Sequence, residues 1–186
     1  MRDAIIEIAA RLFVENGFQE TRIDAIAEEA DVAVGTVYNH FTTKSDILVA
    51  ILLADLGSVV AKTRSLVAEP GSDTVQAMLG IGRAVIDTME QRPRSLWRQL
   101  FAHSLLDAAG LGMTLLAVNR QYIALLRTLL EHLRANGDLA ERFVLTDITA
   151  VTFSIGNSLV YDYIRDDSMT ADDFQAALGR QLAALF

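Results

Sequence analysis

The chain has 186 residues, of which 52% are hydrophobic and none is cysteine, so it supports a sizeable core and excludes disulfides and thiolate metal sites. Its formal net charge of −8 at pH 7 argues against the broad basic surface that many nucleic-acid-binding proteins carry. The longest apolar run, Ile47 to Ala54, is too short to span a membrane, and the N-terminus lacks a signal-peptide pattern, so we expect a soluble, cytoplasmic protein.

Residues 3–16 are predicted to form the first helix, because their apolar residues recur at the spacing of one helix face. Gly17 follows as a C-cap, and Phe18 is expected to anchor the chain against this helix. The helix would brace the segment that comes next. Its apolar positions are Ile5, Ile6, Ala9, Leu12 and Phe13.

The stretch from Thr21 to Asp46 is predicted to contain two short helices, a tight turn and the start of a long helix. Two segments, 21–24 and 43–46, have the form of a capping box, in which a hydroxyl and a carboxylate bond backbone N–H groups at a helix start. Residues 31–35 interrupt the apolar pattern and turn the chain.

The second short helix, residues 36–41, is polar on one side and anchored by Val37 and Phe41 on the other. A helix-turn-helix presents its recognition helix to a DNA major groove in this way, and mixed donors and acceptors suit base edges and phosphates. A solvated surface helix in an ordinary bundle has the same pattern, so the spacing alone leaves both interpretations open. The polar residues are Thr36, Tyr38, Asn39 and His40.

The run GTVYNHF from Gly35 to Phe41, followed by Lys44, is the most specific pattern in the chain. It stands within a longer set of characteristic positions: Ile5, Ala9, Ala10, Leu12, Phe13, Gly17, Phe18, Thr21, Ile26, Ala27, Ala30, Val32, Gly35, Thr36, Tyr38, His40, Phe41, Lys44 and Leu48. On these residues, the segment 5–48 resembles the N-terminal domain of the TetR family of bacterial transcriptional regulators. The resemblance implies a homodimer that binds a pseudo-palindromic operator in double-stranded DNA, most often as a repressor. It also implies that a small-molecule effector releases this dimer from the operator.

The resemblance also implies which residues meet DNA. Gly35, Thr36 and Asn39 would face base edges, and phosphates would be held by Thr21, Tyr38, His40 and Lys44. The predicted DNA-binding residues are Thr21, Arg22, Val34, Gly35, Thr36, Tyr38, Asn39, His40 and Lys44.

Two positions depart from the family pattern. Asp31 stands where the family usually has glycine in the turn, and Ala33 replaces the usual serine or threonine N-cap. Residues 1–50 also carry four Lys and Arg against nine Asp and Glu, a local charge of −5. Because few phosphates would be neutralised, we expect weak non-specific DNA binding with a shallow salt dependence.

The rest of the chain is predicted to be helical, which gives an all-α fold of about nine helices. We predict a helix-turn-helix domain over residues 1–48 and a helical effector-binding and dimerisation domain over residues 49–186. The clearest break is at residues 69–72, which contain a Pro-Gly pair. The later helices are predicted over 44–67, 73–91, 93–106, a long segment ending at 136–137, 147–166 and 170–185.

Aromatic and polar residues in the second domain are candidates to line an effector pocket, although residues of these types at helical spacing are usually plain core. The predicted pocket residues are Trp97, Phe101, His103, Met113, Asn119, Tyr122, Phe153 and Asn157, with Tyr161 as a further candidate. His103 has no metal-ligand partner at a suitable spacing, and no catalytic motif is visible. We therefore predict no cofactor, no metal site and no enzyme.

The last two helices have an apolar excess that predicts a helix-pair interface with a second copy, and an ordinary intramolecular pair is the alternative. The predicted interface residues are Ile155, Gly156, Leu159, Val160, Tyr163, Phe174, Leu178 and Leu182. Our overall prediction is a DNA-binding repressor of the TetR type. One alternative is the same DNA-binding dimer acting as an activator or without any effector. A second alternative, from another class, is a helical enzyme or ligand carrier that retains an unused DNA-binding module, which the acidic N-terminal domain favours.

Overall fold

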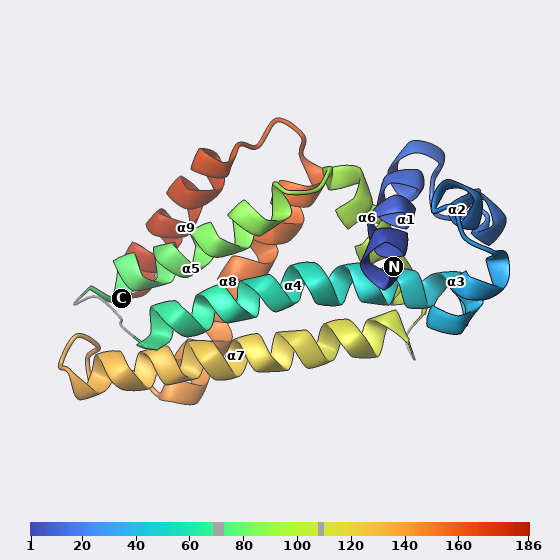
Figure 1. Cartoon of the computed structure of the whole chain (residues 1–186). Helices are drawn as coiled ribbons and strands as arrows, with labels where there is room; N and C mark the ends of the chain where they lie inside the picture. The colour runs from blue at the N-terminus through green and yellow to red at the C-terminus, as the bar shows by residue number, and fades with distance from the viewer. Residues whose placement is uncertain (69–72, 108–109) are drawn as a thin grey trace. The chain divides into compact units, whose positions relative to one another are not determined.

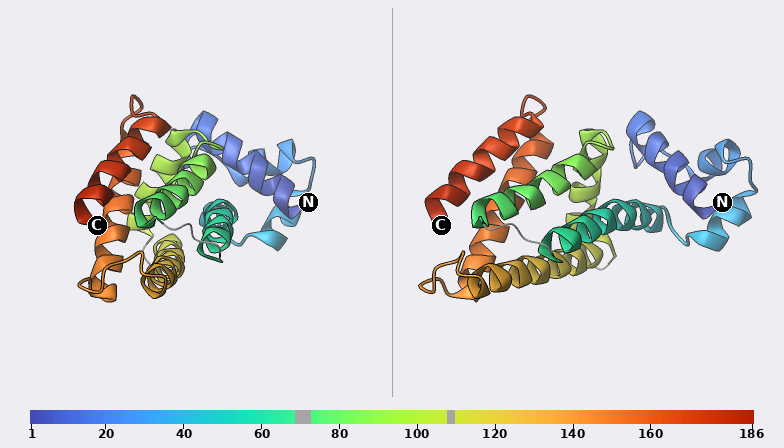
Figure 2. Two further views of the ribbon diagram at one scale, coloured as in Figure 1. Left: turned by 90° about the vertical axis from the view of Figure 1, so that its left-hand side faces the viewer. Right: turned by 60° about the vertical axis from the view of Figure 1, so that its left-hand side comes forward.

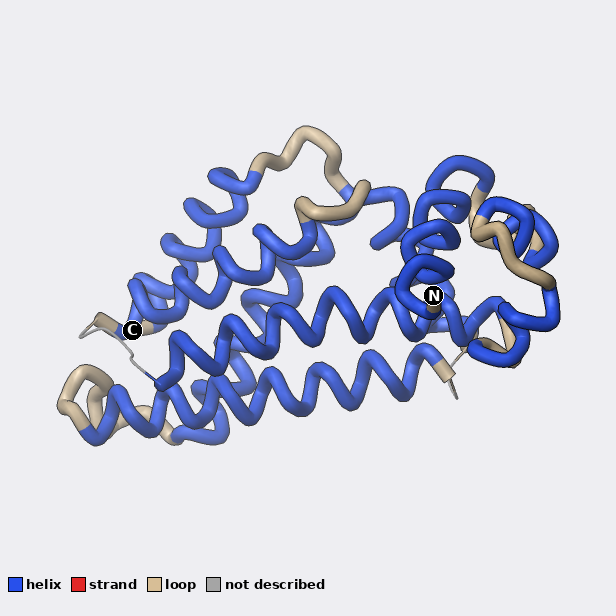
Figure 3. The backbone as a smooth tube through the Cα atoms, in the orientation of Figure 1, coloured by secondary structure: helices blue, strands red, loops and turns tan. Residues whose placement is uncertain are grey.

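The computed structural model describes residues 1–68, 73–107 and 110–186. These residues form nine helices and no strand, which confirms the all-α prediction (Figure 3). The predicted break at residues 69–72 lies outside the described residues. The helices are α1 (Arg2–Asn16), α2 (Ile23–Glu29), α3 (Val34–His40), α4 (Lys44–Ala68), α5 (Thr74–Met89), α6 (Arg94–Leu106), α7 (Leu111–Ala135), α8 (Leu145–Arg165) and α9 (Ala171–Leu185).

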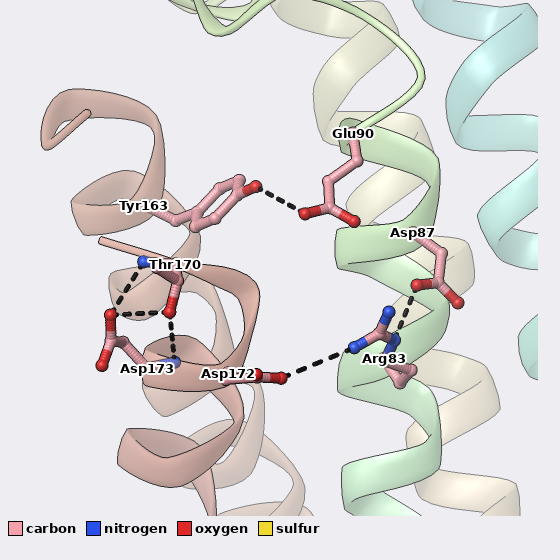
Figure 4. Close-up of polar contacts among 7 residues, drawn as sticks. All are labelled: Arg83, Asp87, Glu90, Tyr163, Thr170, Asp172 and Asp173. Atoms are coloured by element: carbon pink, nitrogen blue, oxygen red, sulfur yellow. Dashed lines mark hydrogen bonds and ion pairs between the residues drawn. The ribbon is translucent and has the colours of Figure 1, made fainter. Parts of the chain in front are cut away.

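Polar side chains fix several helix starts. The predicted capping box of α4 is confirmed, because Thr43 and Asp46 exchange side-chain-to-backbone hydrogen bonds of 2.8 and 3.2 Å. At α9, Thr170 and Asp173 form a second reciprocal box, which Figure 4 shows. Such caps satisfy backbone N–H groups that the first helical turn leaves unpaired.

The chain divides into two compact units. The first unit contains residues 1–57 and 92–117, and the second contains residues 58–91 and 118–186. Helices α4 and α7 contribute to both units. The division differs from the predicted domains because α6 and the first turns of α7 cluster with the N-terminal helices. The predicted functional boundary after residue 48 stays a prediction.

In the first unit, α1 packs against α2 and α6, and α2 packs against α3 (Figure 1). The predicted apolar face of α1 is buried, which confirms the pattern analysis. Gly17 ends α1 with a φ of +86°, a conformation that glycine adopts at no steric cost. The core of this unit includes Ile5, Phe13, Ile26, Val37, Ile47, Leu48, Ile51, Leu96, Trp97 and Leu100.

In the second unit, α9 packs against both α5 and α8, and the three helices lie side by side in both views of Figure 2. The rings of Tyr163 and Phe174 meet edge to face with centroids 6.3 Å apart. The Tyr163 hydroxyl lies 3.4 Å from a Glu90 carboxylate oxygen at the end of α5 (Figure 4). Apolar packing and a small number of polar contacts therefore join these helices.

Among the described residues, no individual helix has the length and apolar character that a membrane crossing needs. Helices α6 and α7 have the required length and apolar character only when they are taken together, and this pair is bent by 107°.

Candidate nucleic-acid interface

The turn between α2 and α3 has the local geometry of a helix-turn-helix. Asp31, at the position where the family usually has glycine, adopts a φ of +52°, in the left-handed region. Aspartate tolerates that conformation better than most residues. The turn is closed by the Val32 N–H, which donates to the carbonyl of Ala27 at 3.0 Å. Ala33 stands at the N-cap of α3 and provides no side-chain hydrogen bond.

Helix α3 is anchored on one side and open on the other. Val37 is completely buried, and Phe41, which caps the helix, is 3% exposed. Tyr38 is 52% exposed, and Asn39 and His40 are also exposed. The structure thus brings the predicted polar residues onto one accessible face. Gly35 is exposed as well, whereas Val34 and Thr36 are half-buried.

Thr21 does not form the capping box that the sequence predicts, and this prediction is wrong. Arg22 occupies the N-cap of α2 and makes no side-chain cap bond. The buried Thr21 hydroxyl instead lies 2.8 Å from the carbonyl of Gly17 and 3.1 Å from that of Leu12. A hydroxyl surrounded by carbonyls donates to them, so in this structure it holds the α1–α2 connection.

Lys44 also bonds the α1–α2 connection. Its ammonium group donates to the carbonyl oxygens of Gln19 at 2.8 Å and Thr21 at 2.9 Å. The same Nζ atom lies 4.6 Å from the centroid of the Phe18 ring, a distance suited to a cation–π contact. Partial burial lowers the pKa of Lys44. The first turn of α4 is therefore tied to the segment before α2.

Lys44→Met should lower the free energy of unfolding by about 1–3 kcal/mol, because two carbonyls lose a charged donor while the apolar stem is kept. Urea unfolding in the absence of DNA measures this change. Arg22→Met is the matched control: its side chain is 80% exposed and its substitution should change stability by less than about 0.5 kcal/mol. Unaltered stability of the Lys44 variant would contradict a structural role.

Helix α6 makes polar contacts with the helix-turn-helix segment that the sequence did not reveal. Gln99 donates to the carbonyl of Phe13 at 3.0 Å and accepts from the N–H of Phe18 at 2.9 Å. His103 Nε2 lies 3.0 Å from the Ser45 hydroxyl, and its ring centroid is 4.6 Å from that of Phe18. One side of α6 thus holds the end of α1 and the start of α4.

Arg92, just before α6, joins two carboxylates from other helices. Its guanidinium bonds Glu7 of α1 at 2.9 and 3.0 Å and also bonds Asp55 of α4. The side chains of Arg92 and Asp55 are only 14% and 10% exposed. Hydrogen bonding to Glu7 raises the pKa of Arg92, and the same contact lowers the pKa of Glu7. Because these partners lie 37 and 85 residues away along the chain, no local sequence pattern predicts the cluster.

The predicted effector residues fall in both compact units. Trp97 is completely buried in the first unit, His103 contacts Ser45, and Met113 is exposed. In the second unit the structure brings Tyr122 and Phe153 together, with ring centroids 6.1 Å apart. Those in the first unit are Trp97, Phe101, His103 and Met113; those in the second are Asn119, Tyr122, Phe153, Asn157 and Tyr161.

Several predicted interface residues are used inside the chain. Leu178 touches the backbone of Gly82 on α5, where even one added methyl group would clash with it. This close packing explains part of the apolar excess of the last two helices. The residues buried within the chain are Leu159, Tyr163, Phe174, Leu178 and Leu182, whereas Ile155, Gly156 and Val160 are half-buried.

The chain is similar to known transcriptional regulators along its whole length. HTH-type transcriptional regulator SrpR of Pseudomonas putida is 24% identical over 185 residues, which are 99% of this chain and 84% of that protein. A TetR/AcrR-family regulator from Thermobifida fusca has a TM-score of 0.75 at 22% identity and covers 97% of this chain and 95% of its own. FadR from Bacillus subtilis, solved with stearoyl-CoA, has a TM-score of 0.74 at 18% identity, and the match covers 100% of this chain and 97% of the FadR chain.

The family itself is identified by the N-terminal segment. The family model for bacterial regulatory proteins of the tetR family matches residues 5–51, which include α1, α2, α3 and the start of α4. Its members are DNA-binding regulators and not enzymes, which agrees with the prediction made for this chain. Residues 5–51 therefore form a helix-turn-helix domain of the tetR family, and the chain as a whole is similar to transcriptional regulators of that type.

Proposed function

We propose that the protein is a repressor that acts in the cytoplasm as a homodimer on a pseudo-palindromic operator. Each subunit would place α3 in a major groove, with Gly35, Thr36 and Asn39 toward base edges and with Tyr38 and His40 toward phosphates. The observation that carries the proposal is the exposed polar face of α3 above the buried Val37.

The half-buried residues of α8 support the homodimer. Ile155, Gly156 and Val160 lie on this helix with the exposed residues Val151 and Tyr161. A Cβ built on Gly156 would meet no atom within 4 Å, so a helix of a second copy has room to approach closely there. We propose that these residues, more than the buried ones of α9, form the contact between subunits.

Selection of bound duplexes from a random pool tests the proposal. The chain should enrich a palindromic sequence. Tyr38→Ala should lose this enrichment, because it removes a proposed phosphate contact. Its folding should be unaffected, because Tyr38 is exposed and supports no core packing. Leu116→Ala is a control, since it removes a large exposed side chain from α7, outside both the helix-turn-helix and the proposed subunit contact, and it should keep the enrichment. Failure to enrich any sequence at low salt would contradict the proposed function.

We further propose that the effector has an apolar body and binds near Tyr122 and Phe153. Tyr122 is half-buried beside the Phe153 ring, and this burial raises the pKa of its phenol. The hydroxyl makes no hydrogen bond to any residue in the described parts of the chain, so it is available to a ligand. The complex of FadR with stearoyl-CoA makes an acyl-CoA the first compound to test.

Tyr122→Phe should weaken release of DNA by stearoyl-CoA by about 2–10-fold, the worth of one hydrogen bond of about 0.5–1.5 kcal/mol. The measurement is a titration of the protein–DNA complex with stearoyl-CoA, read by fluorescence anisotropy. DNA affinity without the compound should be unaltered. An identical titration for Tyr122→Phe and the unaltered chain would exclude the Tyr122 hydroxyl as a ligand contact.

A further inference from the structure

The helix-turn-helix domain has few cations, and the structure shows how each is used. Residues 1–50 contain Arg2, Arg11, Arg22 and Lys44. Arg11 bonds two carboxylates, Glu15 and Glu29, and the ammonium of Lys44 bonds two carbonyls of its own chain. Arg22 bonds the Asp24 carboxylate at 2.8 Å. Each of these three cations therefore has a partner at hydrogen-bond distance within the chain.

Arg2 is placed differently, beside the end of α3. Its guanidinium carbon lies 5.2 Å from the centroid of the Phe41 ring, and Phe41 is the C-cap residue of α3. The ring of His40, at the last position of that helix, lies 6.3 Å from the same Phe41 ring. Arg2 and His40 thus adjoin one aromatic ring where the proposed recognition helix ends.

Apart from the contact with the Phe41 ring, local interactions give little stability to a cation at this position. Arg2 is the first residue of α1, where the helix dipole favours anions over cations. Its side chain is 52% exposed, and its ion pair with the neighbouring Asp3 is long, at 3.9 Å. Such an exposed pair contributes little to folding.

We infer that Arg2 is a phosphate-binding residue that holds the DNA backbone at the C-terminal end of α3. The inference rests on the proposed DNA-binding function. A recognition helix lies in the major groove, so cations beside its end face a phosphate strand. Arginine suits this contact because its planar guanidinium can form two parallel hydrogen bonds with phosphate oxygens. Arg2 lies before the segment 5–51 that the family model matches.

The test is the salt dependence of DNA binding by the full chain and by Arg2→Gln. The probe is a fluorescein-labelled duplex of mixed sequence, titrated between about 50 and 200 mM salt. The slope of log affinity against log salt should fall by about 0.9 for each phosphate that the variant no longer neutralises, or about 1.8 when two subunits bind. Arg2→Lys should keep most of the slope, because it keeps the charge.

Arg11→Gln is the matched control, because it removes an arginine of the same helix that bonds Glu15 and Glu29, and it should leave the slope unchanged. The melting temperature of Arg2→Gln should stay close to that of the unaltered chain, since the unfavourable helix dipole and the contact with the Phe41 ring have opposite effects of similar size. An unaltered slope in Arg2→Gln would overturn the inference while the proposed function stands. No DNA binding by the unaltered chain at the lowest salt would overturn both.

Discussion

Arg92→Met should lower the free energy of unfolding by about 3–5 kcal/mol, because it leaves the buried carboxylate of Asp55 without its cation. Methionine keeps most of the volume of the side chain, so the loss reports the charge and its hydrogen bonds. Urea unfolding followed by fluorescence measures this change. The chain has one tryptophan, Trp97, which is completely buried in the same compact unit as Arg92 and therefore reports on it.

Two further variants make this result specific. Arg83→Met removes an exposed ion pair with Asp87 on α5 and should cost less than about 1 kcal/mol. The double variant Arg92→Met, Asp55→Leu should recover much of the loss, because a buried ion pair can be replaced by apolar residues at little cost. A loss below about 1 kcal/mol for Arg92→Met alone would contradict the role assigned to this cluster.

Asn39→Ala should weaken binding to the selected operator by about 1–3 kcal/mol for each half-site, the worth of a well-made base contact. A palindrome presents the contact twice, so the loss should double for the whole operator. Asn39 is exposed on α3 and supports no packing, so folding should be unaffected. Fluorescence anisotropy with the selected duplex gives the affinity.

Loss of a base contact changes the preferred DNA sequence, whereas loss of a phosphate contact changes the salt dependence of binding. Asn39→Ala should relax the choice of base at one position in each half-site and leave the salt dependence intact. Asn136→Ala, which alters an exposed asparagine after α7, is the control and should change neither property. Equal weakening on every DNA sequence would show that Asn39 does not read a base.

Local patterns predicted most of the fold. The capping box at Thr43 and the C-cap at Gly17 each depend on residues within three or four positions, and each is confirmed. The apolar spacing of α1 likewise placed its buried face correctly. These features are short-range, so the sequence carries them directly.

Tertiary contacts of polar groups are what the sequence pattern does not show. Thr21 has the sequence of a cap, but its hydroxyl bonds the carbonyls of Leu12 and Gly17 instead. Lys44 stays a predicted phosphate contact, and the two carbonyls that bond its ammonium group in this chain have no signal in the local pattern. The partners of Arg92 come from helices distant in sequence, which no periodicity reveals.

The candidate pocket and interface were the least predictable parts. Phe174 and Leu178 of α9 have the spacing of an interface helix, but they pack within the second unit. An apolar helix face has the same pattern whether another helix of the same chain or of a second copy covers it. Burial in the folded chain separates the two cases. Of α8 and α9, α8 is the one with large exposed apolar residues, Val151 and Tyr161.

The proposed function requires that two copies of α3 read two half-sites on one face of a duplex. Hydroxyl-radical footprinting of the chain on its selected operator shows which sugars the protein covers. We expect two protected patches whose centres lie about 34–36 Å, or about one helical turn, apart, related by the symmetry of the palindrome. A single protected patch, or protection spread evenly over any duplex, would contradict the proposed function.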